Sequence, residues 1–180
     1  MISKYKNTVV MRESNNTTNF QDLIILEIGD YISAPYCTKL FADYGANVIK
    51  IEPLQGDSSR KSGPFPKNIP NCETSGLYLN LNTNKKSITL NLNTMDGKTL
   101  FIELIKKCDL LVIDKPSSFL TKLGLSLNIL QELNSSLIIT HITPFGDYGP
   151  YSEYETNDFI SFALTNRMSP HGIAEGPPLQ

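Results

Sequence analysis

The segment Leu23–Glu52, LIILEIGDYISAPYCTKLFADYGANVIKIE, determines the fold predicted for this chain. Leu23–Ile28 is an apolar run with a single acidic interruption, long enough for a strand that is buried on both faces. From Pro35 onward the apolar residues follow a helical period, and Gly45 is typical of the residue just past a helix. Val48–Ile51 then predicts a second buried strand. A strand, a helix and a strand in about thirty residues predict a right-handed crossover between parallel strands.

The helix of this crossover is predicted to bury one apolar stripe, because its apolar residues are spaced i, i+3, i+4 and i+7. In such a unit a ligand binds at the carboxyl ends of the strands, which here lie near Asp30–Ala34 and Glu52–Leu54. The stripe consists of Cys37, Leu40, Phe41 and Tyr44.

The remaining chain continues the alternation of strands and helices. After a long irregular loop over Pro53–Thr74, a helix that begins near Thr94 or Asp96 is predicted to bury Leu100, Phe101, Leu104, Ile105 and Cys108. This alternation predicts an α/β layered, Rossmann-like fold with a mainly parallel sheet. Strands are predicted over Leu77–Leu81, Ser87–Leu92, Leu110–Ile113 and Leu137–Ile142, and further helices over Leu127–Leu133 and Asp158–Thr165.

Composition limits the classes of function. A length of 180 residues suggests one domain, here residues 23–180 after a polar arm over residues 1–22. The net charge of −2 gives no global basic field for nucleic acid, and no apolar run reaches the roughly 20 residues that cross a membrane. The chain has three cysteines, and two of them lie on predicted apolar faces, which fits buried thiols in a reducing, cytoplasmic setting better than a disulfide framework.

Two other kinds of site are disfavoured by the residues. The turn after the first strand, GDYISAP over Gly29–Pro35, lacks the G-x-G-x-x-G pattern of a dinucleotide site, so Glu52 is interpreted as a structural acid at a strand end. His141, in a predicted strand, and His171, in a loop, have no cysteine or histidine at metal-ligand spacing. Both are interpreted as ordinary polar residues near the surface, and no metal site is expected.

Several motifs, in order along the chain, resemble the family III CoA-transferases, which include formyl-CoA and carnitine CoA-transferases. The first is the opening stretch LEIGDYISAPYCTKLFADYGANVIKIEP followed by GDSSR. Together the motifs extend over nearly all of Leu23–Gln180, but the family enzymes are at least twice as long, so the resemblance is to their N-terminal portion. The later motifs are NTNKKSITLNLNTMDGK, CDLLVIDKPS, LGL, FGDYGPY and EGPPL.

The resemblance implies a Rossmann-like fold that is incomplete relative to the family. It also implies an enzyme that moves CoA between carboxylic acids, with CoA or acyl-CoA as substrate and no permanently bound cofactor. Family members form interlocked homodimers, so the resemblance implies either a homodimer of a longer protein or a separate chain that supplies the missing half.

The resemblance also implies which residues contact CoA. The phosphates of CoA need cations or backbone donors, for which the chain offers Arg60, Lys61, Lys85, Lys86, Lys115 and Lys122. At three positions the chain departs from the family pattern, since Pro53 stands where Arg is common, Asn93 where Lys is common and Lys122 where Arg is common. A weakened grip on the phosphates is therefore expected. The matching positions are Ile32, Ser33, Pro53, Leu90, Asn93, Asp114, Lys115, Pro116 and Lys122.

No catalytic residue is assigned within the chain. In the family an Asp attacks the acyl-CoA thioester and lies shortly after the GPP motif, here Gly176–Pro178, so its position falls past Gln180 and the chain alone is expected to be inactive. Asp158 has two interpretations. It is a helix-start residue, or it is the acid/base Asp of the α-methylacyl-CoA racemases, which have a GHD motif where this chain has Thr156-Asn157-Asp158. A racemase-like enzyme and a non-catalytic CoA-binding fragment therefore remain alternatives.

Overall fold

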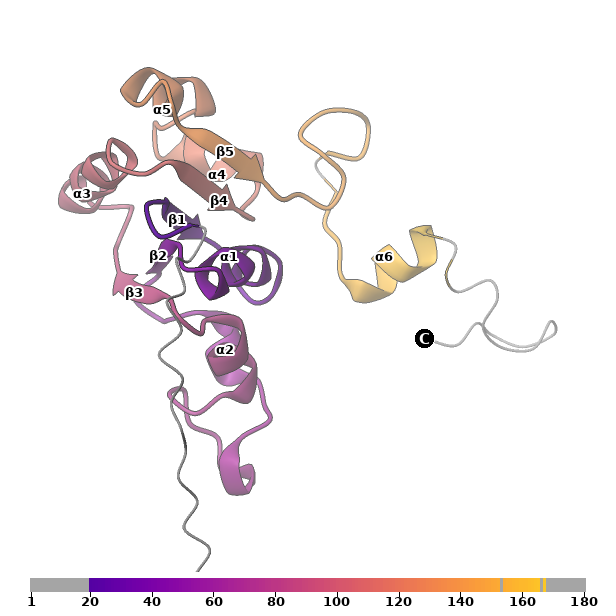
Figure 1. Cartoon of the computed structure of the whole chain (residues 1–180). Helices are drawn as coiled ribbons and strands as arrows, with labels where there is room; N and C mark the ends of the chain where they lie inside the picture. The colour runs from indigo at the N-terminus through magenta and orange to yellow at the C-terminus, as the bar shows by residue number, and fades with distance from the viewer. Residues whose placement is uncertain (1–19, 153, 166, 168–180) are drawn as a thin grey trace, which may run out of the picture.

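The computed structural model describes residues 20–152, 154–165 and 167. The predictions for residues 1–19 of the polar arm, for His171 and for the EGPPL motif lie outside these residues. Strands alternate with helices along the described chain (Figure 1), as the sequence predicts. The strands are β1 (Ile24–Ile28), β2 (Asn47–Glu52), β3 (Lys86–Thr89), β4 (Leu110–Ile113) and β5 (Ile138–His141). The helices are α1 (Ser33–Asp43), α2 (Gly76–Leu81), α3 (Met95–Ile105), α4 (Ser117–Lys122), α5 (Leu127–Leu133) and α6 (Asp158–Leu164), with short 3₁₀ turns η1 (Ser58–Lys61) and η2 (Pro66–Asn68).

All five strands form one parallel sheet in the order β3-β2-β1-β4-β5. The chain starts in the middle of the sheet, builds outward to β3 and then returns to the other side of β1. The strand order therefore reverses between β1 and β4, and a fold of this kind opens a crevice at the carboxyl ends of those two strands. The α/β fold with a parallel sheet is confirmed.

The sheet has an apolar core on each face, because β1 and β4 are buried along almost their whole length. On one face Leu26 and Leu111 pack with Phe101 and Ile105 of α3 and with Leu130 of α5. On the other face Ile25, Val48 and Val112 pack against Ala34 and Ala42 of α1. The two helical layers keep the strands fixed, so the loops that follow them have a rigid base.

The face that α1 buries differs from the predicted stripe. Leu40 and Tyr44 are 46% and 61% exposed, and Cys37 and Phe41 are half-buried. The residues that face the sheet are small or polar, because they cover an acidic side chain: Thr38 Oγ1 donates a hydrogen bond to Glu27 Oε2 at 2.6 Å. The prediction was wrong because it followed apolarity alone. The buried residues of α1 are Ala34, Pro35, Thr38 and Ala42.

The segment predicted as a strand over Leu77–Leu81 is instead helix α2. Ser75 accepts a hydrogen bond from the backbone N–H of Tyr78, which is the side-chain cap that starts a helix. One turn later Leu81 is buried on the same side as Tyr78. The predicted strand over Ser87–Leu92 is shorter than expected and ends at Thr89.

The last helix, α6, lies apart from the sheet beyond a long loop (Figure 1). Phe159 and Leu164 are 56% and 65% exposed, and Ala163 is exposed too. Among the described residues no helix combines the length and the apolar character needed to traverse a membrane.

Candidate functional site

The turn after β1 lies at the reversal of strand order and is held by side chains from the neighbouring strands. The Asp114 carboxylate, just after β4, accepts hydrogen bonds from the backbone N–H of Asp30 at 3.1 Å and of Ala34 at 3.2 Å. Lys50 Nζ, from β2, donates to the carbonyl of Gly29 at 3.2 Å. Burial raises the pKa of Asp114, although these N–H groups oppose the shift. Asp114 therefore holds backbone in place, and its carboxylate is directed at the turn.

The loop after β2 is joined to this turn by two reciprocal contacts. Asp57 Oδ1 accepts from the backbone N–H of Tyr31 at 3.3 Å, and Asp30 Oδ1 accepts from the backbone N–H of Ser58 at 2.8 Å. Burial tends to raise the pKa of Asp30, but the hydrogen bonds from Ser58 and the charge of Lys115 outweigh it and the pKa is lowered. We call these two contacts the loop clasp, since each loop supplies one carboxylate and one N–H group.

Beneath the clasp lies a buried charge cluster formed by Glu27, Lys50, Asp57 and Lys85. Lys50 Nζ is 2.6 Å from both Glu27 Oε1 and Asp57 Oδ2, and its side chain is 1% exposed. Lys85 Nζ is 2.9 Å from the other oxygen of Glu27. Burial by itself favours the neutral form of a lysine and tends to lower its pKa. For Lys50 the two carboxylates outweigh burial, so its pKa is raised. For Lys85 burial prevails and the pKa is lowered.

Glu52 is the structural acid that the sequence predicts. Its Oε2 accepts from Arg60 Nε at 2.7 Å and its Oε1 from Tyr78 Oη at 2.6 Å, while Asp57 N–H donates at 2.9 Å. Burial disfavours the charged form, but the hydrogen bonds from Arg60, Ser87 and Tyr78 outweigh it and the pKa of Glu52 lies well below its usual range. This network holds the loop after β2 in place through Asp57 and Arg60.

These networks remove two cations from the set expected to contact phosphates. The guanidinium of Arg60 donates hydrogen bonds to both carboxylate oxygens of Glu52, and its Nη1 also lies 3.4 Å from Glu73 Oε1. The side chain of Lys85 is 1% exposed and donates to Glu27 and to the carbonyl of Pro35. The expectation that Arg60 and Lys85 face a ligand is therefore wrong, because each neutralises a buried carboxylate. Lys61, Lys86 and Lys122 are exposed, and Lys115 is half-buried.

A first cavity of about 280 Å³ lies at the carboxyl ends of β1, β2 and β3, and we call it the strand-end cavity. Its walls are mostly apolar, with the side chains of two asparagines, a glutamine and Lys115 among them. Such a cavity suits a ligand that has a flat or apolar body and a few polar groups. The lining residues are Ile28, Gly29, Ile51, Pro53, Leu54, Gln55, Leu90, Asn91, Leu92, Asn93, Lys115 and Phe119.

A second cavity of about 520 Å³ lies where the strand order reverses, and we call it the switch-point cavity. Lys115 lines it as well, so the two cavities meet at this residue. Lys115 Nζ is 3.8 Å from Asp30 Oδ2 and its side chain is 30% exposed. The lining residues are Asp30, Tyr31, Ser33, Asp114, Lys115, Pro116, Ile142, Thr143, Pro144, Thr156, Asn157, Asp158 and Ser161.

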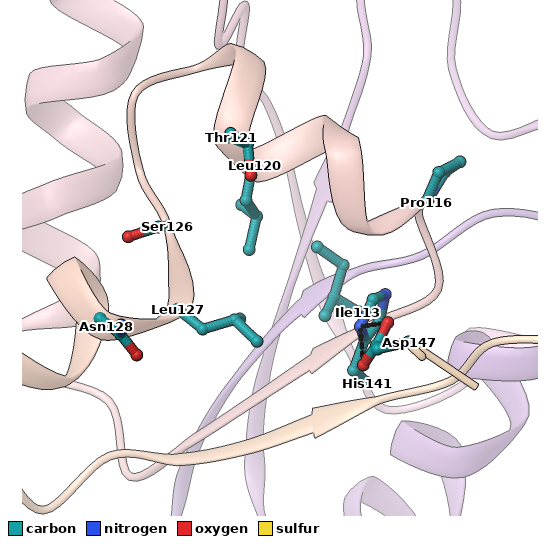
Figure 2. A pocket seen from close by; sticks show the side chains of 9 residues that line it. All are labelled: Ile113, Pro116, Leu120, Thr121, Ser126, Leu127, Asn128, His141 and Asp147. Carbon is teal, nitrogen blue, oxygen red and sulfur yellow. Dashed lines mark hydrogen bonds and ion pairs between the residues drawn. The ribbon is translucent and has the colours of Figure 1, made fainter. Parts of the chain in front are cut away.

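A third cavity of about 280 Å³ lies between α4, α5 and β5, with Ile113, Leu120 and Leu127 directed into it (Figure 2). At one end His141 Nδ1 lies 3.0 Å from Asp147 Oδ2, and Nε2 lies 2.7 Å from the carbonyl oxygen of Lys115. His141 is thus a half-buried polar residue that bridges two loops, which is consistent with its interpretation as an ordinary polar residue near the surface. Among the described residues no group of histidine, cysteine, aspartate or glutamate side chains could hold a metal ion.

The comparison with known sequences assigns the family. Residues 20–180 match the sequence profile of CoA-transferase family III. The chain belongs to CoA-transferase family III. It is 34% identical over 155 residues to cinnamoyl-CoA:phenyllactate CoA-transferase of Clostridium sporogenes, a match that covers 86% of this chain and 38% of the relative. It is 38% identical over 157 residues to formyl-CoA:oxalate CoA-transferase of Bradyrhizobium diazoefficiens, covering 86% of this chain and 36% of that enzyme.

Solved structures of the family have the same fold. A CaiB/BaiF family protein from Brucella suis superposes with a TM-score of 0.78 at 28% sequence identity, over 88% of this chain and 42% of that one. Rv3272 from Mycobacterium tuberculosis superposes with a TM-score of 0.80 at 25% identity, over 89% and 44%. The chain therefore spans about two fifths of the length of the family III proteins that it matches.

The residues that the family III resemblance nominates fall into three groups. Four of them, Pro53, Leu90, Asn93 and Lys115, line the strand-end cavity. Ser33, Asp114 and Pro116 line the switch-point cavity together with Lys115. Ile32, which is 42% exposed, and Lys122, in the last turn of α4, line neither of these two cavities.

Some cavity residues were not nominated by sequence. Gln55 and Phe119 line the strand-end cavity, and Tyr31 and Thr143 line the switch-point cavity. For Gln55, Tyr31 and Thr143 the available signal was a position shortly after a strand, since Tyr31, for example, falls within Asp30–Ala34, the segment expected at a strand end. Phe119 lies within α4 and had no such signal. Asp158 also lies in the switch-point cavity, as the first residue of α6, whose cap is the Asn157 side chain that accepts from the N–H of Ile160 at 3.0 Å.

Proposed function

We propose that residues 23–180 form the CoA-binding part of an enzyme that transfers CoA between carboxylic acids. The observation that carries the proposal is the grouping of Pro53, Leu90, Asn93 and Lys115, which are distant in sequence, around one cavity at the carboxyl ends of the strands. Ligands of open parallel sheets bind at this edge. Family membership supports CoA or an acyl-CoA as the substrate, and we propose that the enzyme binds no permanent cofactor.

We propose that the nucleotide end of CoA occupies the strand-end cavity and that the thioester end extends past Lys115 into the switch-point cavity. Lys115 lines both cavities, which supports a single ligand that passes from one to the other. The strand-end cavity has the more apolar walls, as a purine needs, while the exposed Lys122 on α4 is assigned to a phosphate in solvent. We assign Ser33, Asp114 and Pro116, which line the switch-point cavity, to the thioester side, and with them Ile32, the residue before Ser33 in the same turn.

We further propose that CoA is transferred through an Asp thioester intermediate, on a carboxylate that is not among residues 1–180. The Asp first displaces CoA from the acyl-CoA to form a mixed anhydride, and the CoA thiolate then attacks the Asp carbonyl, which releases the carboxylic acid and leaves CoA on the Asp. The whole protein then acts as a homodimer, or with a separate chain that supplies the remaining part, and the exposed apolar side chains of α6 support such a contact. A reducing, cytoplasmic location is supported by Cys37, Cys72 and Cys108, all of which are free thiols.

Removal of the Lys115 charge is expected to weaken binding of CoA by about 10- to 100-fold, since a hydrogen bond to a charged group contributes about 1.5–3 kcal/mol. Lys115→Met keeps most of the apolar stem, so the cavity wall remains. Lys122→Ala is expected to weaken binding by a similar factor. Titration calorimetry with CoA at low salt measures both effects.

The matched control is Lys107→Met, because Lys107 is exposed and lies just before β4, at the amino ends of the strands and therefore opposite the proposed site. This variant is expected to bind CoA within about twofold of the parent chain. If the parent chain binds no CoA, the proposal fails. If Lys122→Ala and the parent chain bind equally well, the role of Lys122 is refuted.

The chain alone is expected to form no covalent acyl intermediate, because the proposed nucleophile is not among its residues. Incubation with an acyl-CoA and then with hydroxylamine converts a carboxylate thioester into a hydroxamate, which mass spectrometry detects. We expect no modified residue within residues 1–180. A modified Asp or Glu there would contradict the assignment, and exchange of the acyl α-proton with deuterated solvent would favour the racemase alternative, with Asp158 as acid/base.

A further inference from the structure

Tyr31 has a backbone conformation that aromatic residues rarely adopt. Its φ is +64°, in the left-handed region, where a side chain crowds its own backbone. The side chain is 45% exposed and lines the switch-point cavity. Glycine is the residue that this conformation favours, so a tyrosine at this position lowers the stability of the fold relative to a glycine.

The conformation of Tyr31 is imposed from both sides. Asp57 accepts a hydrogen bond from its N–H at 3.3 Å, and Asp114 accepts one from the N–H of the preceding Asp30 at 3.1 Å. Lys50, which is buried, anchors Asp57 at 2.6 Å. The loop clasp and the charge cluster therefore hold the turn in a shape that presents Tyr31 to the cavity.

We propose that Tyr31 contacts the acyl group of the CoA thioester and that the switch-point cavity selects acyl groups with an apolar body and no free carboxylate. This inference rests on the proposed function, which places the thioester end of CoA in that cavity. The tyrosine ring is a flat apolar surface at the mouth of the crevice, and Pro116, Ile142 and Pro144 add apolar walls.

The charges that line the switch-point cavity are the reason why we expect it to disfavour acyl groups with a free carboxylate. Asp30, Asp114 and Asp158 line it, against the single cation Lys115, which is already near Asp30. A second carboxylate on the acyl group would meet this negative field without a free cation among the lining residues, and like charges repel over such distances. A dicarboxylic acyl group is therefore disfavoured relative to an aryl or aliphatic one.

The test compares three probes, CoA, phenylacetyl-CoA and succinyl-CoA, on four forms of the full chain: the parent, Tyr31→Gly, Tyr31→Phe and Tyr36→Ala. We expect the parent to bind phenylacetyl-CoA roughly tenfold more tightly than succinyl-CoA. Tyr31→Gly should abolish most of that preference, leave the affinity for CoA within about threefold, and leave the urea midpoint equal or higher, because glycine relieves the left-handed strain.

Two variants make the test specific. Tyr31→Phe keeps the ring and is expected to keep the preference. Tyr36→Ala removes a neighbouring aromatic that is 52% exposed and does not line the cavity, and it is expected to keep the preference too. If the parent binds CoA but Tyr31→Gly leaves the preference unchanged, or Tyr31→Phe loses it, the inference is overturned while the proposed function stands. If the parent binds none of the three probes, the proposed function itself fails.

Discussion

Replacement of Lys50 by methionine is expected to lower the free energy of unfolding by about 3–5 kcal/mol, the cost of breaking a buried ion pair. Lys50 lies 2.6 Å from both Glu27 and Asp57, and both of these side chains are buried. Glu27 would keep Lys85, but Asp57 Oδ2 has no hydrogen bond besides its ion pair with Lys50 and would be left as a buried charge. Against a typical stability of about 5–15 kcal/mol this loss is large.

Urea unfolding followed by circular dichroism measures the effect, since the midpoint should fall markedly with little change in slope. Lys39→Met is the matched control, because Lys39 pairs with Asp43 on the surface of α1 and such pairs contribute about 0–1 kcal/mol. The double variant Lys50→Met/Asp57→Asn should recover part of the loss, since it removes the stranded charge. Equal midpoints for Lys50→Met and Lys39→Met would show that the cluster does not stabilise the fold.

Phe101→Ala is expected to destabilise the chain by about 3–5 kcal/mol, as for other fully buried aromatic residues. Phe101 is 0% exposed and packs from α3 onto the sheet, in the same core as Leu26 and Leu111. The cavity left behind would be lined by side chains that the sheet holds in place, so it could not collapse fully.

The neighbouring Leu100→Ala provides the comparison within the same helix. Leu100 is 56% exposed, and its truncation is expected to change stability by no more than about 0.5 kcal/mol. Thermal unfolding of the two variants separates them clearly. Similar losses for both would mean that α3 is rotated relative to the sheet, because the sequence pattern alone places both residues on one stripe.

The buried strands were predicted well from the sequence. β4 (Leu110–Ile113) has the predicted boundaries, as does helix α5 (Leu127–Leu133), while β1 begins one residue later than predicted and β2 is one residue longer at each end. Buried parallel strands form continuous apolar runs, which few other structures produce. Gly45 follows α1 with a φ of +96°, as its position past the helix predicts.

The helix faces were harder to predict because apolarity and burial diverge in this protein. In α1 the sheet-facing residues are Ala34, Pro35, Thr38 and Ala42, since a buried Glu27 requires a hydroxyl and small side chains above it. The sequence showed Glu27 as an acidic interruption in a strand predicted to be buried on both faces, but it did not show that Thr38 of α1 would be its hydrogen-bond partner. Leu77–Leu81 was mistaken for a strand because a short apolar run has no clear period, and the Ser75 cap decided the outcome.

The location of the candidate site could be predicted from the sequence, but the ion pairs and hydrogen bonds within it could not. Strand ends are found from sequence, and four of the nominated residues meet around one cavity. Which cations remain available depends on pairings between residues far apart in the chain. Lys85 and Glu27, for example, are 58 positions apart, and a pairing over that separation cannot be recognised in a single sequence.

The position of Asp114 has a consequence for how phosphates are bound. The first turn of a helix carries a partial positive charge, and α/β proteins commonly place a phosphate there. In α1 the N-cap residue Ile32 provides no side-chain acceptor, and Asp114, just after β4, takes that role by accepting a hydrogen bond from the N–H of Ala34. The helix dipole is thus already neutralised by the protein itself. Under the proposed function, the pyrophosphate of CoA would therefore gain little attraction from this helix and would depend on exposed lysines, whose attraction is screened over about 8 Å at physiological salt.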